Sequence, residues 1–313
     1  MEVRLPNIEG AEMNTLYIIG NGFDLFHDVR SKYKNFQGWL NCKDIEHEHF
    51  VEEMEELFPL SNRHGNLLWK DFEDALGKYD LGYIQKRFSG KESNPYFDED
   101  YQRRAAQKMN DIVCKIPLYL REWLSNLDIK GMPEKLTLSP LGKYLTFNYT
   151  LLLEQVYRIP ARQILHIHGD INNTESLITG HDKPYSMNGI DIKNCNTERS
   201  WENISIAVNS LVKPVEDNIQ RHKNYFNSLS NIVNIIVFGH SLSRVDIPYF
   251  IEVIKKVSDN ASWYFVVYDD SDIEKVQKFI RYTDKRFNEY IGEDRYRHKL
   301  KMENCNYCKI VNN

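Results

Sequence analysis

The sequence of 313 residues has few cysteines, no long hydrophobic run and no excess of basic residues. Its five cysteines, an odd number, favour free thiols in a reducing compartment, so we expect a cytoplasmic protein. No apolar stretch approaches the roughly 20 residues that a membrane-spanning helix needs, and the first residues lack the apolar core of a signal peptide. With a net charge of −5, general binding to nucleic acid is not expected either.

Short apolar runs alternate with helical stretches over much of the sequence. A hydrophobic content of 42%, with 12% aromatic residues, is sufficient for a buried core. Short apolar runs that end at turn residues are typical of buried strands in a parallel sheet. The expected strands are 16–19, 144–147, 163–168, 232–238 and 263–268. Strands that alternate with helices predict an α/β fold with a doubly wound, mainly parallel, Rossmann-like sheet.

A long helical stretch interrupts this α/β pattern between about residues 31 and 130. Within it, Phe50, Met54 and Leu57 recur at helical spacing, and glutamates occupy many of the positions between them. The stretch is too long for one crossover helix. We therefore expect a single α/β nucleotide-binding domain over residues 1–313 with a large helical insertion at about 31–130.

Two side-chain patterns lie inside this insertion. Trp69, Phe72 and Leu76 recur at helical spacing and are expected in its core. His47 and His49 are two residues apart, so on a helix they face different directions, and both are expected to be exposed to solvent.

Two glycine turns follow expected strands. Gly20, Asn21 and Gly22 come directly after the first strand, where glycine lets backbone N–H groups approach a phosphate. Gly239 and Ser241 form a second turn, and its hydroxyl can donate to phosphate or ribose oxygens. All five residues are predicted to bind a nucleotide cofactor. A simple tight turn is the alternative for the first of them.

Acidic residues stand close to these turns and at the last strand end. Asp24 is assigned to the same cofactor site as the first turn, and Asp269 is placed to accept from a ribose hydroxyl. A solvated turn is an equal alternative for Asp269. Near the second turn, Ser243 or Asp246 is expected to cap the helix that follows.

An amide and an imidazole at two neighbouring strand ends are the candidate catalytic residues. Asn148 follows the second strand, and its amide can orient a water or a ribose hydroxyl. His168 precedes Gly169, and a histidine near neutral pKa suits general acid–base catalysis. His166 and His168 are expected to point to one face of a strand. The alternatives are a capping role for Asn148 and a hydrogen-bonded core role for one histidine.

A metal site is the rival interpretation of the His-x-His-x-Asp run formed by His166, His168 and Asp170. No later histidine stands at a recognisable ligand spacing, so no metal is expected. Cys305 and Cys308 form a CxxC without a second pair nearby, and metal binding there is not expected.

These motifs, in this order, resemble the AbiH family of bacterial abortive-infection proteins, which act against bacteriophages. The resemblance extends from about residue 15 to residue 270, most of the chain. It rests on the stretches 16–25, 31–33, 69–73, 145–150, 166–169 and 239–243, together with Phe36 and Asp246.

The same order of motifs is more remotely similar to the sirtuin-like NAD-binding fold. That resemblance implies that the turn at Gly20–Gly22 holds the pyrophosphate, that Asn148 and His168 form the catalytic pair, and that Ser241 contacts the cofactor. Two departures stand out. The paired CxxC motifs of deacylating sirtuins are missing between Gly169 and Gly239, so protein deacylation is not expected. Thr150 stands where such enzymes tend to carry an aspartate.

The resemblance implies an abortive-infection effector that binds NAD as its substrate and hydrolyses the nicotinamide–ribose bond. A non-catalytic nucleotide-binding sensor is the alternative, followed by a metal-dependent hydrolase of nucleotides or nucleic acid. The expected partners are a small-molecule nucleotide, a phage-derived trigger or partner protein, and further copies of the chain in a homo-oligomer.

Overall fold

The computed structural model describes residues 2–3, 5–6, 10–58, 67–78, 99–172, 177–182, 206, 209–286 and 299–311. The chain divides into two compact units. The first unit contains Met1–Ser31, Leu127–Glu175 and Pro214–Asn313, and the second contains Lys32–Asn126 and Ser176–Lys213. Two parts of the stretch expected as a helical insertion, residues 59–66 and 79–98, lie outside the described residues.

The first unit is built on a seven-stranded sheet in the described part of the chain, with the order β1-β7-β6-β5-β2-β3-β4. β1 pairs antiparallel with β7, and all the other pairs are parallel. The strands are β1 (Glu2–Val3), β2 (Thr15–Ile19), β3 (Lys143–Thr146), β4 (Ile164–His166), β5 (Asn234–Phe238), β6 (Ser262–Val267) and β7 (Cys305–Val311). The five predicted strands are confirmed, with ends shifted by up to two residues.

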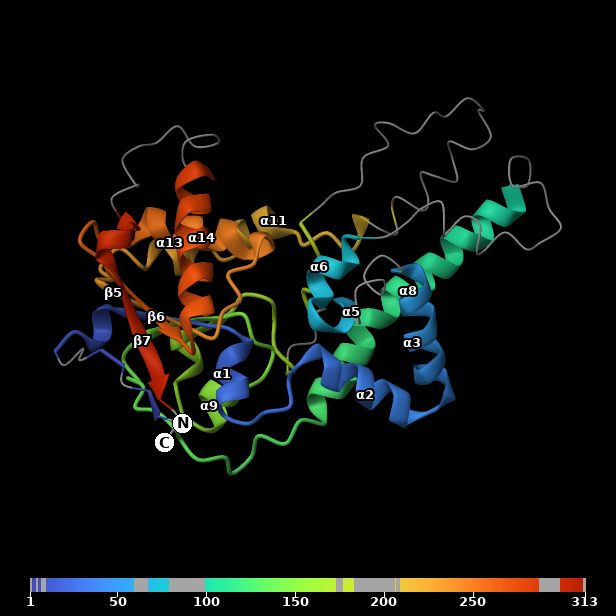
Figure 1. The fold of residues 1–313 in the computed structure, drawn as a ribbon, viewed down its shortest axis with the longest axis horizontal. Coiled ribbons are helices and arrows are strands. Elements are labelled where there is room, and N and C mark those ends of the chain that lie inside the picture. Colours follow the sequence, from blue (N-terminus) through green and yellow to red (C-terminus); the bar gives the residue numbers. More distant parts are fainter. Residues whose placement is uncertain are drawn as a thin grey trace. The chain divides into compact units, whose positions relative to one another are not determined.

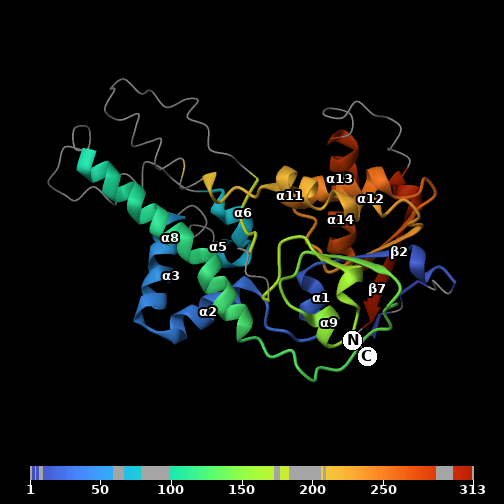
Figure 2. The same ribbon diagram turned by 180° about the vertical axis from the view of Figure 1, so that it is seen from behind.

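Helices cover both faces of this sheet, which confirms the doubly wound α/β fold. One face carries α11 (Val215–Arg221), α12 (Lys223–Asn227), α13 (Ile247–Lys256) and α14 (Asp270–Arg286), and the other carries α1 (Asn21–Phe26) and α9 (Leu152–Gln155) (Figures 1 and 2). Short 3-10 helices are η1 (Glu12–Asn14), η2 (Ala161–Gln163), η3 (Arg244–Asp246) and η6 (Met302–Asn304). Among the described residues, no helix is both long enough and apolar enough to cross a membrane.

The central strands are apolar on both faces because each face packs against helices. In β2, Leu16 and Ile18 belong to one core cluster, while Tyr17 and Ile19 belong to the cluster on the opposite face. The Tyr17 ring stacks on that of Tyr144 in β3, with centroids 4.6 Å apart. Successive residues of a strand point to opposite faces, and here both faces are buried, so every position is apolar. This accounts for the continuous apolar runs in the sequence.

In the described residues, the second unit consists mainly of helices. They are α2 (Tyr33–Lys43), α3 (Ile45–Leu57), α5 (Leu67–Lys70), α6 (Phe72–Leu76) and α8 (Glu99–Ser125). Trp69, Phe72 and Leu76 are buried, as their helical spacing predicts. The Phe36 ring of α2 contacts the rings of Trp69 and Phe72 edge-on, so a cluster of aromatic rings forms part of the core of this unit.

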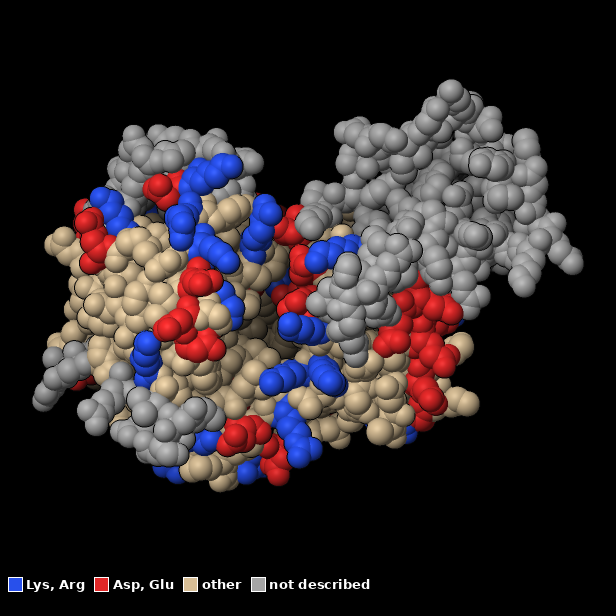
Figure 3. All heavy atoms as spheres, viewed as in Figure 1, with Lys and Arg blue, Asp and Glu red and all other residues tan. Residues whose placement is uncertain are grey.

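Helix α3 separates apolar from acidic side chains, as its sequence pattern predicts. Its first turn is capped by Asp44, whose Oδ1 accepts from the backbone N–H groups of Glu46 and His47 at 3.0 and 3.1 Å. Phe50 and Met54 are buried, and acidic side chains gather on the surface over this helix (Figure 3).

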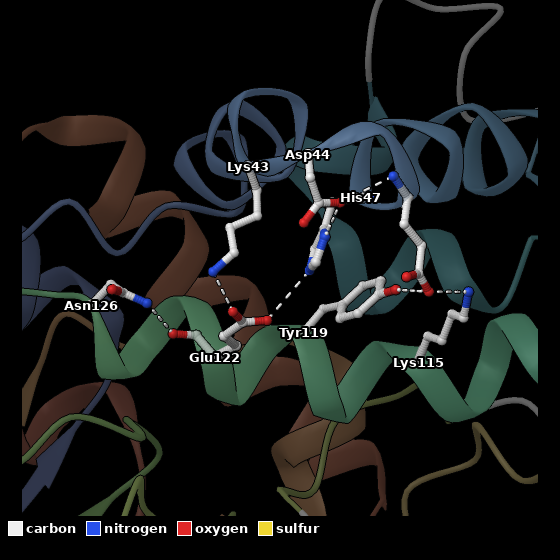
Figure 4. A network of polar contacts seen from close by, with 8 residues as sticks. Lys43, Asp44, His47, Lys115, Tyr119, Glu122 and Asn126 are labelled. Atoms are coloured by element: carbon white, nitrogen blue, oxygen red, sulfur yellow. Dashed lines mark hydrogen bonds and ion pairs between the residues drawn. The ribbon is translucent and has the colours of Figure 1, made fainter.

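The prediction that His47 is exposed to solvent is wrong. His47 is buried, with Nδ1 2.7 Å from Asp44 Oδ1 and Nε2 3.3 Å from Glu122 Oε2 of α8 (Figure 4). Its ring also lies 4.2 Å from that of Tyr119, centroid to centroid. These partners, of which Glu122 and Tyr119 are distant in sequence, replace water. His49 is exposed as predicted, with 68% of its side chain accessible.

Pro117 lies inside α8, which continues to Ser125. Proline removes one backbone hydrogen bond and clashes with the preceding turn, so the packing of the final turns must outweigh this cost. Leu120, Trp123 and Leu124 beyond the proline are buried and provide that packing.

Candidate functional site

Four of the predicted segments come together at the carboxyl edge of the parallel sheet in the first unit. The chain runs from β2 outward to β3 and β4, and then returns to the other side of β2 to form β5. Doubly wound sheets bind ligands at this point, where the strand order reverses. The segments that follow the four strands are 20–24, 147–150, 167–170 and 239–243.

The two glycine turns touch each other. The N–H of Gly22 donates to the carbonyl oxygen of Gly239 at 2.8 Å, and that of Gly20 donates to Phe238 at 2.9 Å. A Cβ on Gly20 would lie 2.5 Å from the Cα of His240, and one on Gly22 would lie 2.6 Å from the Cα of Gly239. Gly239 also has a φ of +69°, which favours glycine. The glycines therefore allow two backbones to meet, and these two N–H groups donate within the protein.

Asn21 fastens the loop that follows α1. Its Oδ1 accepts from the hydroxyl of Ser31 at 2.5 Å, and its Nδ2 donates to the carbonyl oxygen of Ser31 at 3.0 Å. The pairing closes a ten-residue loop around α1 and so holds the first glycine turn in place.

Asp24, Asn148 and Thr150 form a buried polar group between the ends of β2 and β3. Asn148 Nδ2 donates to Asp24 Oδ1 at 2.7 Å and to the carbonyl oxygen of Gly20 at 3.1 Å. The Thr150 hydroxyl donates to Asp24 Oδ2 at 2.7 Å. Asn148 Oδ1 is buried and accepts no hydrogen bond from the described residues. Of the predicted site residues, Gly20, Asp24 and Asn148 are thus in direct contact.

The Asp24 carboxyl titrates far from its ordinary range. Only 1% of Asp24 is exposed, and burial raises the pKa of its carboxyl from 3.8 to about 6. The hydrogen bonds from Thr150 and Asn148, together with the charge of His166, oppose this shift without cancelling it. Asp24 therefore changes its charge in a range close to neutral pH.

His166 and His168 do not share a face, so that prediction is wrong. His166 Nδ1 lies 2.9 Å from the carbonyl oxygen of Asn148, and Nε2 lies 2.8 Å from Glu154 Oε1 of α9. His168 instead packs against the rings of Phe147 and Tyr249. β4 ends at His166, and the alternation of side chains along the strand ends with it.

The surroundings of His166 favour its protonated form. Burial alone would lower the pKa of His166, but the hydrogen bond to Glu154 and the charge of that carboxylate outweigh it, so the pKa is raised. Both ring nitrogens face oxygen acceptors, which only the protonated ring satisfies.

His168 shares a buried carboxylate with a second histidine. His168 Nε2 lies 3.5 Å from Asp246 Oδ1, and His240 Nε2 lies 3.7 Å from Asp246 Oδ2. The N–H of Leu242 donates to His240 Nδ1 at 2.8 Å, so in the neutral ring the proton of His240 is on Nε2, facing Asp246. Only 3% of His168 is exposed. A carboxylate placed in this way can stabilise an imidazolium.

The expected capping roles near the second turn are wrong. Neither the Ser243 nor the Asp246 side chain caps a helix, because Ser243 donates its hydroxyl to Asp246 at 3.1 Å and Asp246 faces the two histidines. Ser241 is exposed on the turn. Asp269 Oδ1 accepts from the backbone N–H of Ser271 at 2.8 Å, which makes this carboxylate a cap at the start of α14.

Sequence patterns did not assign a functional role to Glu154, His240 or Asp246. Glu154 pairs with His166 and Asp246 with His168, twelve and 78 residues away, and His240 meets Asp246 across a turn, so local spacing carries no signal. Among the described residues, no group of three or more His, Cys, Asp or Glu side chains is arranged to hold a metal ion.

Comparison with protein families decides the relationship of this chain to known proteins. The family model described as "Bacteriophage abortive infection AbiH" matches residues 16–268. The chain belongs to the AbiH family. The match includes both glycine turns, the Asp24–Asn148 contact and the His168–Asp246–His240 cluster. Comparisons with curated proteins and with solved structures find no match.

AbiH membership implies a role in abortive infection, in which an infected bacterial cell limits the spread of a phage. The buried polar groups described above lie within the matched residues. They are therefore the candidate site for that role.

Proposed function

We propose that this AbiH protein is an antiphage effector that acts in the cytoplasm, binds NAD at the carboxyl edge of its sheet and hydrolyses the nicotinamide–ribose bond. The observation that carries the proposal is that Asn148 and His168 follow the neighbouring strands β3 and β4, beside the reversal of strand order between β2 and β5. Nucleotides bind at such reversals in doubly wound sheets.

In the proposed reaction, a water oxygen bonds to C1′ of the ribose while the bond from C1′ to the nicotinamide nitrogen breaks. The electron pair of that bond goes to the cationic pyridinium ring, which leaves as neutral nicotinamide. His168, whose Nε2 lies 3.5 Å from Asp246 Oδ1, takes the proton of the water. Asp246 then stabilises the imidazolium, and Asn148 positions the water or the ribose.

Because His168 is buried, the proposed enzyme is inactive before infection. Only 3% of His168 is exposed, so NAD reaches this imidazole only after the residues around it open a path. A phage-derived trigger, a partner protein or assembly into a homo-oligomer would supply the free energy for that opening.

The test measures nicotinamide released from NAD by purified protein, alone and with lysate from phage-infected cells. We expect release with wild-type protein and at least a 100-fold slower reaction for His168→Ala, about the contribution of a general base. His49→Ala is the matched control, since that imidazole is 68% exposed on α3. A His168→Ala protein as active as wild type would remove His168 from the mechanism.

A second candidate is a nucleotide-binding sensor without catalysis. The enclosed position of His168 and the contact between the two turns favour it, since a regulatory domain needs no route for water to a buried base. Calorimetry would show tight NAD binding, while the same samples release no nicotinamide even with infected-cell lysate.

A further inference from the structure

The side-chain amide of Asn148 has only one orientation that its surroundings accept. Both hydrogens of Nδ2 face acceptors, Asp24 Oδ1 at 2.7 Å and the Gly20 carbonyl oxygen at 3.1 Å. A flipped amide would place Oδ1 against these two oxygens, and acceptors repel one another. The side-chain oxygen of Asn148 is therefore directed away from Asp24, and among the described residues it has no donor.

Asp24 itself has no oxygen that is unused by the protein. Oδ1 accepts from Asn148, Oδ2 accepts from Thr150, and 1% of the residue is exposed. A carboxylate in this position acts on a ligand only through its neighbours. This differs from direct contact with the cofactor, which the sequence pattern predicts for Asp24.

We propose that Asp24 is the positioning residue that fixes the Asn148 amide with its oxygen toward the ligand, so that this part of the site accepts a hydrogen-bond donor and rejects an anion. The inference rests on the proposed function, because NAD is the ligand considered. It assigns the neutral, hydroxyl-bearing part of a nucleotide to Asn148 and places the phosphates elsewhere.

The charge of Asp24 controls this orientation. Once protonated, its O–H can donate to Oδ1 of a flipped Asn148, so only the Gly20 carbonyl oxygen still opposes the flip and the preference for one orientation is weakened. The charged or titratable neighbours are His166 at the end of β4 and Glu154 of α9, which pairs with His166. Burial raises the pKa of Asp24 to about 6, so the switch falls within a pH range that binding assays cover.

Calorimetric binding of NAD between pH 5 and pH 8 tests the proposal with three variants. Asp24→Asn keeps an acceptor for Asn148 and has no charge to titrate, so we expect near wild-type affinity and no inflection near pH 6. Asp24→Leu removes the acceptor, and we expect at least a 10-fold weaker affinity. Thr150→Val removes a hydrogen bond that lowers the Asp24 pKa, and we expect the inflection to move to higher pH.

A second measurement needs no ligand. In ¹⁵N NMR spectra, the side-chain amide signal of Asn148, identified by its loss in Asn148→Ala, should titrate near pH 6 in wild type and stay constant in Asp24→Asn. A constant signal in wild type, or Asp24→Leu affinity equal to wild type, overturns the role of Asp24 while leaving NAD binding intact. Wild-type protein that titrates as expected but binds no NAD at any pH, with or without lysate from phage-infected cells, refutes the proposed function instead.

Discussion

A buried carboxylate in the middle of the candidate site lowers the stability of the folded protein. Burial raises the pKa of Asp24 from 3.8 to about 6, so the folded protein holds a proton that the unfolded chain has already released between these values. The free energy of unfolding therefore falls as pH rises from about 4 to 6. Each pKa unit corresponds to about 1.4 kcal/mol, which limits the loss to about 3 kcal/mol.

Asp24→Asn should raise the free energy of unfolding at pH 7. Asparagine keeps the polar contacts of Asp24 without a buried charge, so we expect a gain of up to about 3 kcal/mol over wild type, declining to zero below pH 4. Urea denaturation at several pH values measures the difference. The matched control is Asp28→Asn, because Asp28 is exposed and its pKa is lowered by Lys135. A gain at pH 7 that persists at pH 3.5 would contradict the explanation by charge.

At the residue scale, sequence patterns locate side chains that follow strands but not their partners. Asn148 and Asp24 stand at strand ends, and parallel strands bring their carboxyl ends to one edge, so their proximity follows from the fold. Asp246 is different. Its position before α13 favours capping by local rules, whereas burial beside His168 and His240 gives its charge better partners.

At the scale of elements, the contact between the two glycine turns decides how closely β2 and β5 approach at their carboxyl ends. Gly22 and Gly239 leave no room for a side chain, since a Cβ on Gly239 would lie 2.2 Å from the backbone nitrogen of Phe23. Any larger residue must separate the turns or shift α1.

Gly22→Ala should destabilise the protein and disturb the candidate site. Its Cβ would lie 2.6 Å from Gly239 Cα, and relief of this overlap should cost about 1–3 kcal/mol. Gly38→Ala is the matched control. Gly38 lies within α2, and a Cβ there would meet no described atom within 4 Å, so we expect a gain of about 0.5–1 kcal/mol. Thermal denaturation compares the two, and equal effects would refute the role of the contact.

The strands β2 to β6 were predictable from the sequence, while β1 and β7 were not. β2 and β5 are continuous apolar runs because both their faces are covered, but in β7 the polar residues Asn306 and Lys309 interrupt the apolar ones, so that signal is missing. Cys305 packs against one core cluster and Cys308 against the other, since residues three apart on a strand point to opposite faces. This CxxC is therefore a pair of core residues.

At the scale of the whole molecule, the fold of one unit is easier to predict from the sequence than the fold of the other. The sheet unit has a repeating strand–helix order that topological rules reduce to few arrangements. The helical unit has amphipathic patterns that predict its helices. Its core depends on contacts such as Phe36 with Trp69 and His47 with Glu122, which no pattern of spacing encodes.

The two candidate functions, NAD hydrolysis and NAD sensing, predict different NAD levels in infected cells. If NAD is hydrolysed, cells that express the wild-type protein should lose most of their NAD after infection and release few phage. Cells that express His168→Ala should keep their NAD and be lysed, because the proton from water has no acceptor, whereas His49→Ala should behave as wild type. Protection by wild type without a fall in NAD would instead favour the sensor, since a binding domain consumes no substrate. Mass spectrometry of NAD and nicotinamide over the infection, with equal protein levels verified by immunoblot, separates these outcomes.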